Sequence, residues 1–258
     1  MAEGFRCSGS WVTDPKIGIR FALVWDRSVQ QVPFRNEAKM MTSSFGVEAA
    51  SNLILRFCLL FCLFLGFGFP AIAQVRMPEI PTEKMTVEQK KAADEFLGAR
   101  KQPIMGPFIP LLRSPEVLLR AQAMGDYLRF KSALPQKIRE LVVLITARDW
   151  TQQFEWSHHA ELAIKAGLDP EIVKAVADGR RPTGMSADEE TTYEFCTELL
   201  HNKSVTDATY GRAIAAFGDQ GTIDMVSLTG YYTFVSMVLN VNRTPPPAGA
   251  ALLVPFPK

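Results

Sequence analysis

Two residues four positions apart, Glu155 and His159, place a carboxylate and an imidazole inside an apolar segment. They belong to the stretch from 140 to 167, ELVVLITARDWTQQFEWSHHAELAIKAG, which holds two of the three histidines of the chain. On a helix, positions i and i+4 lie about 40° apart on one face. Leu162, Ala163 and Ala166 follow on that face, so the pair lies in an apolar stripe. Removing an ionisable group from water is costly unless it is paired, so this pair needs either a compensating partner or a function.

Glu140 is the expected partner of His159. It lies on the preceding apolar segment, on the face that contains Val143, Leu144 and Ala147. A short connection between the two helices would make them antiparallel neighbours and bring Glu140 close to His159. Carboxylates beside a histidine can fix its tautomer and adjust its pKa toward the working pH, as proton transfer requires. The residue types alone are equally compatible with a buried ion-pair network that only fixes the register of the helices.

Three further residues of the same stretch, Gln152, Trp156 and His158, flank the carboxylate and imidazole, and we expect them to contact a substrate. His158 lies about 100° from His159 around a helix. It is therefore a flanking residue and not the proton carrier.

A metal site is an alternative use of Glu140, Glu155 and His159, because carboxylate and imidazole groups both bind divalent cations. The stretch lacks a recognised zinc spacing such as H-E-x-x-H. We therefore expect no metal and no cofactor. His201, near the end of a later helix, has the sequence context of a surface or helix-terminal histidine.

Helix caps and apolar periodicity divide the region after residue 74 into helices. Thr86-x-x-Gln89 and Ser186-x-x-Glu189 are capping boxes, while Ser114-Pro115 and Asp169-Pro170 place a proline in the first helical turn. We expect Thr151 to cap the histidine helix, Thr206 to cap a later one, and the proline-rich residues 100–113 to break the pattern. The expected helices end near Ala99, Phe130, Ala147, Gly167, Asp178, Leu200, Phe217 and Asn240. No alternating strand pattern is found, so the predicted fold is all-α, with about seven helices in one domain.

A strongly apolar run, residues 53–73, precedes this helical region. Only about 13 apolar residues separate Arg56 from Pro70, fewer than the roughly 20 that span a bilayer. The run ends in Ala-Ile-Ala before Gln74, a pattern typical of signal peptide cleavage. We expect export to the periplasm or the medium, with cleavage near Ala73 and no stable membrane anchor afterwards. A transmembrane anchor is the alternative.

These features predict five segments. Residues 1–39 are a non-native or unstructured extension, since a start at Met40 or Met41 would give the signal peptide its usual position. The others are the signal peptide (40–73), an arm, helix and proline-rich segment (74–113), the helical domain with the Glu and His residues (114–243), and an irregular tail (244–258).

Charge and cysteine content exclude some classes of protein. Residues 74–258 contain 21 Lys and Arg against 22 Asp and Glu, a net charge of −1 with histidine neutral. Nucleic acids and anionic membranes require concentrated positive charge, so neither is an expected partner. Cys7, Cys58 and Cys62 precede the cleavage position, and a mature chain with Cys196 alone would have no internal disulfide.

The pattern Glu140-x11-Gln152-x2-Glu155-x3-His159 resembles the active site of the carboxymuconolactone decarboxylase and alkyl hydroperoxidase D superfamily. The peroxidase branch has two cysteines where this chain has Gln152 and Glu155. The decarboxylase branch lacks these cysteines and keeps Glu-x3-His, as this chain does. The resemblance covers about residues 110–242 and implies an alkyl hydroperoxidase D-like fold and a homo-oligomer, either a trimer or a hexamer.

The resemblance also implies a function. A decarboxylase-type member would be a cofactor-free lyase acting on a small unsaturated or lactone carboxylic acid, with His159 as proton carrier and Glu155 and Glu140 orienting it. Peroxide reduction requires a thiolate and a resolving thiol, and Cys196 is about forty residues away from the matching positions, so peroxidase activity is disfavoured. Because lactone breakdown of this kind is intracellular, the expected export leaves a non-catalytic module that binds a small ligand as an alternative.

Overall fold

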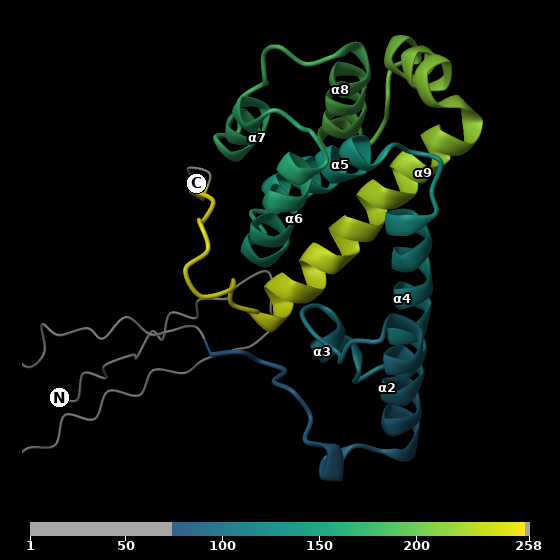
Figure 1. Cartoon of the computed structure of the whole chain (residues 1–258), viewed down its shortest axis with the longest axis vertical. Helices are drawn as coiled ribbons and strands as arrows, with labels where there is room; N and C mark the ends of the chain where they lie inside the picture. Colours follow the sequence, from purple (N-terminus) through teal and green to yellow (C-terminus); the bar gives the residue numbers. More distant parts are fainter. Residues whose placement is uncertain (1–73, 256–258) are drawn as a thin grey trace, which may run out of the picture. The chain divides into compact units, whose positions relative to one another are not determined.

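The computed structural model describes residues 74–255, and their regular structure is entirely helical (Figure 1). This part of the chain contains eight α-helices, one 3-10 helix and no β-strand, which confirms the predicted all-α fold. No helix within it is both long and apolar enough to cross a membrane. The upstream extension, the signal peptide and Cys7, Cys58 and Cys62 lie outside the described residues. The elements are η1 (Thr82–Lys84), α2 (Val87–Arg100), α3 (Phe108–Leu111), α4 (Pro115–Phe130), α5 (Gln136–Asp149), α6 (Gln153–Lys165), α7 (Pro170–Ala177), α8 (Ala187–Asn202) and α9 (Asp207–Asn242).

Helices α5 and α6 form a hairpin closed by a three-residue turn. The Gln152 N–H donates to Ala147 O, and the Thr151 N–H donates to Arg148 O. These two bonds define a Schellman motif, whose left-handed residue is usually glycine. Here that residue is Thr151, with φ 46°. The predicted cap is therefore wrong: Gln152 is the N-cap of α6, and its side chain accepts a hydrogen bond from the Phe154 N–H.

The other predicted caps hold with one exception. Both capping boxes form, at Thr86 and at Ser186. Asp169 and Thr206 accept backbone hydrogen bonds at the starts of α7 and α9. Ser114 occupies the N-cap position of α4, but its side chain makes no capping hydrogen bond.

Helix α5 is the most enclosed element, because α6, α7, α8 and α9 all pack against it (Figure 1). Leu141, Val142 and Leu144 have no exposed surface. Since so many faces of α5 are covered, three of its polar residues, Glu140, Thr146 and Arg148, are buried as well, and Glu140 is only 8% exposed. A carboxylate near the start of this helix must therefore find its partner inside the protein.

Helix α9 crosses α5 and α6 diagonally and is interrupted at Gly218, with φ 68° and ψ −178° (Figure 1). The break lies where the sequence predicts one helix to end and another to begin. The Thr222 hydroxyl donates to Gly218 O at 2.8 Å and satisfies a carbonyl at the break. The longer part of α9, after Gly218, contains the residues that face the site.

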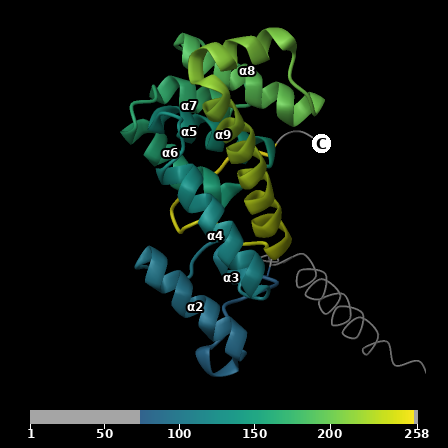
Figure 2. The same ribbon diagram turned by 90° about the vertical axis from the view of Figure 1, so that its right-hand side faces the viewer.

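Helix α3 was not predicted, because prolines dominate residues 100–113. Its one turn buries Phe108 and Leu111, and it packs against α4 and α9. Helix α2 lies against α4 on the side away from α7 and α8 (Figure 2).

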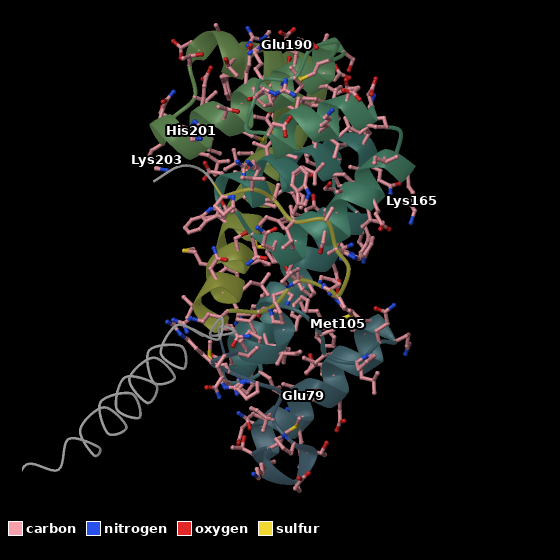
Figure 3. All side chains as sticks on the ribbon, turned by 90° about the vertical axis from the view of Figure 1, so that its left-hand side faces the viewer. Glu79, Met105, Lys165, Glu190, His201 and Lys203 are labelled. Atoms are coloured by element: carbon pink, nitrogen blue, oxygen red, sulfur yellow. The ribbon has the colours of Figure 1, made fainter. Side chains whose placement is uncertain are left out.

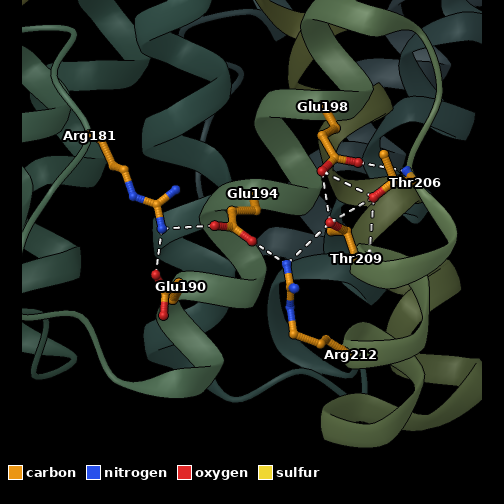
Figure 4. Close-up of polar contacts among 7 residues, drawn as sticks. All are labelled: Arg181, Glu190, Glu194, Glu198, Thr206, Thr209 and Arg212. Atoms are coloured by element: carbon orange, nitrogen blue, oxygen red, sulfur yellow. Dashed lines mark hydrogen bonds and ion pairs between the residues drawn. The ribbon is translucent and has the colours of Figure 1, made fainter.

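An exposed polar network joins α8 to the first turns of α9 (Figure 4). Glu194 on α8 forms ion pairs with Arg181, at 2.8 Å, and with Arg212. Glu198 accepts a hydrogen bond from the Thr209 hydroxyl at 2.7 Å. Exposed ion pairs contribute about 0–1 kcal/mol each, so the network orients the start of α9 more than it stabilises the fold.

The segment after α9, described to residue 255, has no helix or strand, yet it is bound to the hairpin. The Gln153 side chain exchanges two hydrogen bonds with the backbone of Leu253, at 2.7 and 2.8 Å. Leu253 is 3% exposed and joins the core.

Asp224 on α9 generates a stability prediction. It is 4% exposed and accepts hydrogen bonds from the Ala133 N–H at 2.8 Å and the Tyr127 hydroxyl at 3.1 Å. Asp224→Ala removes the acceptor of both donors and should lower the free energy of unfolding by about 1–3 kcal/mol. Urea denaturation measures the loss. Asp219→Ala, at an exposed position of the same helix, is the control, and equal losses in the two variants would contradict the role assigned to Asp224.

Candidate active site

His159 is the centre of a buried hydrogen-bonded group. Its Nδ1 lies 2.6 Å from Glu140 Oε2, and its Nε2 lies 3.4 Å from Glu155 Oε2. Glu155 shares a face of α6 with His159, whereas Glu140 reaches the ring from α5 across the hairpin. His159 is 2% exposed and Glu155 is 5% exposed. The structure therefore brings together the three residues that the sequence singled out for proton transfer.

Tyr232 on α9 completes this group. Its hydroxyl lies 3.1 Å from His159 Nε2, and the two rings meet edge to face with their centroids 5.1 Å apart. Tyr232 is not among the residues that the sequence predicts for the site. Its only signal in the sequence is a pair of polar aromatic residues, Tyr231 and Tyr232, in a segment rich in Met, Val and Leu.

The surroundings of His159 favour its protonated form. Burial alone would lower the pKa of His159, but hydrogen bonds to Glu140 and Glu155 and their negative charges raise that pKa above its ordinary value. A carboxylate oxygen lies opposite each ring nitrogen, so an imidazolium can donate one hydrogen bond to each. Burial raises the pKa of Tyr232 well above its ordinary value, so its hydroxyl stays neutral.

A cavity of about 530 Å³ lies beside this group and has the size of a small-molecule site. Glu140 is not part of its wall and lies behind His159. The polar wall residues are Arg100, Gln102, Arg129, Glu155, His158 and His159, and the aromatic ones are Phe96, Phe108, Phe130, Phe154, Tyr231 and Tyr232.

Two glycines allow the close packing of this wall. A side chain at Gly125 on α4 would overlap the Tyr231 hydroxyl. Gly106 has φ 56°, and a Cβ there would lie 2.8 Å from the Phe154 ring. Both positions therefore require glycine for the aromatic rings to keep their places.

His158 lies in the cavity wall, where a substrate could touch it. Its ring meets that of His159 edge to face at a centroid distance of 5.0 Å. Burial lowers the pKa of His158, and the positive charges of His159 and Arg129 lower it further. The pKa of His158 is thus shifted in the opposite direction from that of His159.

The other two expected substrate contacts, Gln152 and Trp156, do not reach the cavity. Gln152 is 3% exposed; besides capping α6, its side-chain amide donates to Asn240 Oδ1 at 2.8 Å. Trp156 is 5% exposed and belongs to the hydrophobic core, because it lies about 100° around α6 from Glu155. The geometry therefore corrects these two assignments: one residue holds the turn and the other fills the core.

No group of three or more His, Cys, Asp or Glu side chains between residues 74 and 255 is arranged to hold a metal ion. His201 lies on the surface, as predicted, with its Nε2 2.9 Å from Asp149 Oδ1. It is far from Met105 of the cavity wall (Figure 3).

Cys196, the one cysteine in the described part of the chain, is buried on α8 and does not line the cavity. Its Sγ lies 3.6 Å from the Thr229 hydroxyl. Burial raises the pKa of this thiol to about 12. It is therefore a small apolar core residue at neutral pH.

Comparisons with known proteins agree with this architecture. Residues 115–198, from α4 into α8, match the model of the Carboxymuconolactone decarboxylase family. The matched region contains Glu140, Glu155 and His159 but not Tyr232.

The fold is similar to a crystal structure described as an alkylhydroperoxidase AhpD core, an uncharacterized peroxidase-related protein from Ralstonia eutropha JMP134. The TM-score is 0.55 at 15% identity, over 67% of this chain and 92% of that one. This likeness confirms the predicted alkyl hydroperoxidase D-like fold. No curated protein matches the chain.

The raised pKa of His159 generates a pH prediction. A raised folded-state pKa stabilises the protein fully below the unfolded value, about 6.5, and this stabilisation is lost as the pH rises through the folded pKa. Glu140→Gln removes one cause of the raised pKa. The loss in free energy of unfolding should therefore be largest below pH 6.5 and should shrink toward pH 9, as measured by denaturant titration.

Glu161→Gln is the control, since Glu161 is an exposed carboxylate of α6, the helix of His159, and it pairs with Lys165. Its effect should be small and independent of pH in this range. A loss in Glu140→Gln that stays constant with pH would contradict a charged His159.

Proposed function

We propose that this chain is a cofactor-free lyase of the carboxymuconolactone decarboxylase type, acting on a small unsaturated or lactone carboxylic acid. The observation that supports the proposal most is the position of His159. Its ring lies in the wall of a mostly apolar cavity and is held between Glu140 and Glu155. The family match over residues 115–198 supports the same class.

The proposed reaction exchanges carbon dioxide for a proton. The bond between the substrate carbon and its carboxylate breaks, and the electron pair passes into the conjugated system of the substrate. His159 Nε2 delivers a proton to carbon, and solvent restores it after the product leaves. Glu140 and Glu155 balance the charge of the imidazolium, and the apolar wall favours loss of the charged carboxylate.

Tyr232 has a positioning role in this proposal. Its neutral hydroxyl lies 3.1 Å from His159 Nε2, and both residues line the cavity. This hydrogen bond and the edge-to-face ring contact fix the direction in which the proton is presented.

Export and self-association complete the proposal. The signal peptide pattern supports export, with cleavage after Ala73. An exposed apolar stripe on α9, formed by Ile223, Val226, Met237 and Val241, supports packing against further copies of the chain in a trimer or hexamer.

The first test replaces His159. Against a panel of unsaturated lactone carboxylic acids, His159→Gln should lower turnover by about 10²–10⁴-fold, because it removes the proton donor. Release of carbon dioxide measures the reaction. His201→Gln, on the surface, should retain full turnover. Turnover within a factor of two in His159→Gln would exclude His159 as proton carrier, and saturable binding without product would favour the binding module.

The second test addresses peroxidase activity. With its pKa at about 12, the Cys196 thiol stays protonated at neutral pH and cannot attack a peroxide. Peroxide consumption with a dithiol reductant should stay at background, and Cys196→Ser should change neither this rate nor carbon dioxide release. Stoichiometric sulfenic acid at Cys196, with peroxide turnover lost in the serine variant, would assign the chemistry to α8 instead.

A further inference from the structure

Two arginines, Arg100 and Arg129, line the cavity, and their surroundings differ. Arg100 forms an ion pair with Asp126 at 2.8 Å. Its guanidinium also stacks over the Phe108 ring, with Cζ 4.4 Å from the centroid. The charge of Arg100 is therefore balanced and its position is fixed by contacts within the protein.

Arg129, in the last turn of α4, has no hydrogen bond or ion pair with any residue between 74 and 255. Its guanidinium lies over the Phe130 ring, with Cζ 5.1 Å from the centroid. The side chain is half-buried, so it has lost part of its hydration without gaining an anion. An anion that entered the cavity would restore the missing interaction.

The charge of Arg129 acts on the same side chains that surround the proposed chemistry. The pKa of His158 is lowered by burial, then by the charge of His159, and then by the charge of Arg129. The charge of Arg129 also opposes the effect of burial on the pKa of Tyr232. The guanidinium therefore lies within electrostatic reach of the proton-transfer group.

We propose that Arg129 is the residue that binds a carboxylate of the substrate, and that Arg100 only supports the cavity wall. A guanidinium and a carboxylate form two parallel hydrogen bonds, which fix orientation as well as position. This assignment rests on the proposed function, because it takes the cavity beside His159 as the substrate site.

The proposed reaction determines which carboxylate Arg129 holds. In the transition state, negative charge moves away from the carboxylate that is leaving. An ion pair to that group would stabilise the ground state more than the transition state and would slow the reaction. Arg129 therefore holds an anionic group that remains in the product, while the departing carboxylate lies against the apolar rings.

Binding of benzoate and benzamide to the full chain tests the assignment. The two probes share one ring and nearly one shape but differ in charge, and isothermal titration calorimetry measures both dissociation constants. The unmodified protein should bind benzoate at least tenfold more tightly than benzamide. Arg129→Gln should bring the two constants within twofold of each other by weakening benzoate binding alone, and Arg129→Lys should keep part of the preference.

Arg120→Gln is the matched control. Arg120 is on the same helix and is exposed, and it pairs with Glu116 outside the cavity. Its replacement removes the same charge and should keep the preference for benzoate. No preference in the unmodified protein, or a preference that survives in Arg129→Gln, would overturn the assignment.

The outcomes separate this inference from the proposed function. A benzoate preference that depends on Arg129, in a protein without turnover, would support carboxylate binding by Arg129 and reject the lyase activity. A benzoate preference that survives in Arg129→Gln, with turnover lost in His159→Gln, would reject carboxylate binding by Arg129 and support the lyase activity.

Discussion

A buried imidazole held between two carboxylates is the interaction on which the site and much of the fold depend. His159, Glu155 and Glu140 are all less than a tenth exposed, and charges so buried are strongly destabilising unless they are paired. The contact between Glu140 and His159 fixes α5 against α6, and the contact between Tyr232 and His159 fixes α9 against both. The helices and the proton-transfer group therefore stabilise each other. A purely structural network would explain the pairing, but it would not require the ring to lie in the wall of a cavity.

The wall of the cavity combines aromatic residues with a few charged ones. Six of the residues that line its wall are Phe or Tyr, which suits an unsaturated substrate and disfavours a free carboxylate. The charges of His159 and Arg100 are paired inside the protein, whereas Arg129 is the residue proposed to bind a ligand. Close packing sets these positions, because Gly125 and Gly106 leave space that only the Tyr231 and Phe154 rings fill. Proton transfer is thus proposed for α6 and anion binding for α4.

The sequence predicts what depends on local spacing and misses what depends on tertiary packing. Glu155 and His159 are found from their separation on one helix, and Glu140 is found because a short turn makes α5 and α6 neighbours. Tyr232 and Arg129 come from helices outside the α5–α6 hairpin, and no local pattern distinguishes them from core or surface residues. Gln152 and Trp156 were wrongly expected to contact a substrate because they are close to His159 in sequence. Side chains at neighbouring positions of a helix point in different directions, so closeness in sequence does not place them at the cavity. Thr151 was misassigned because its left-handed backbone conformation usually belongs to glycine.

The protonation state of His159 is the most direct test of this account, since everything proposed for the cavity assumes an imidazolium between two carboxylates. Long-range ¹H–¹⁵N correlation spectra of the imidazole report whether each ring nitrogen carries a proton. At pH 6.5, where an unperturbed histidine is about half protonated, the account predicts that both nitrogens of His159 are predominantly protonated in the ligand-free protein. A neutral ring at that pH, with one nitrogen free of its proton, would contradict it.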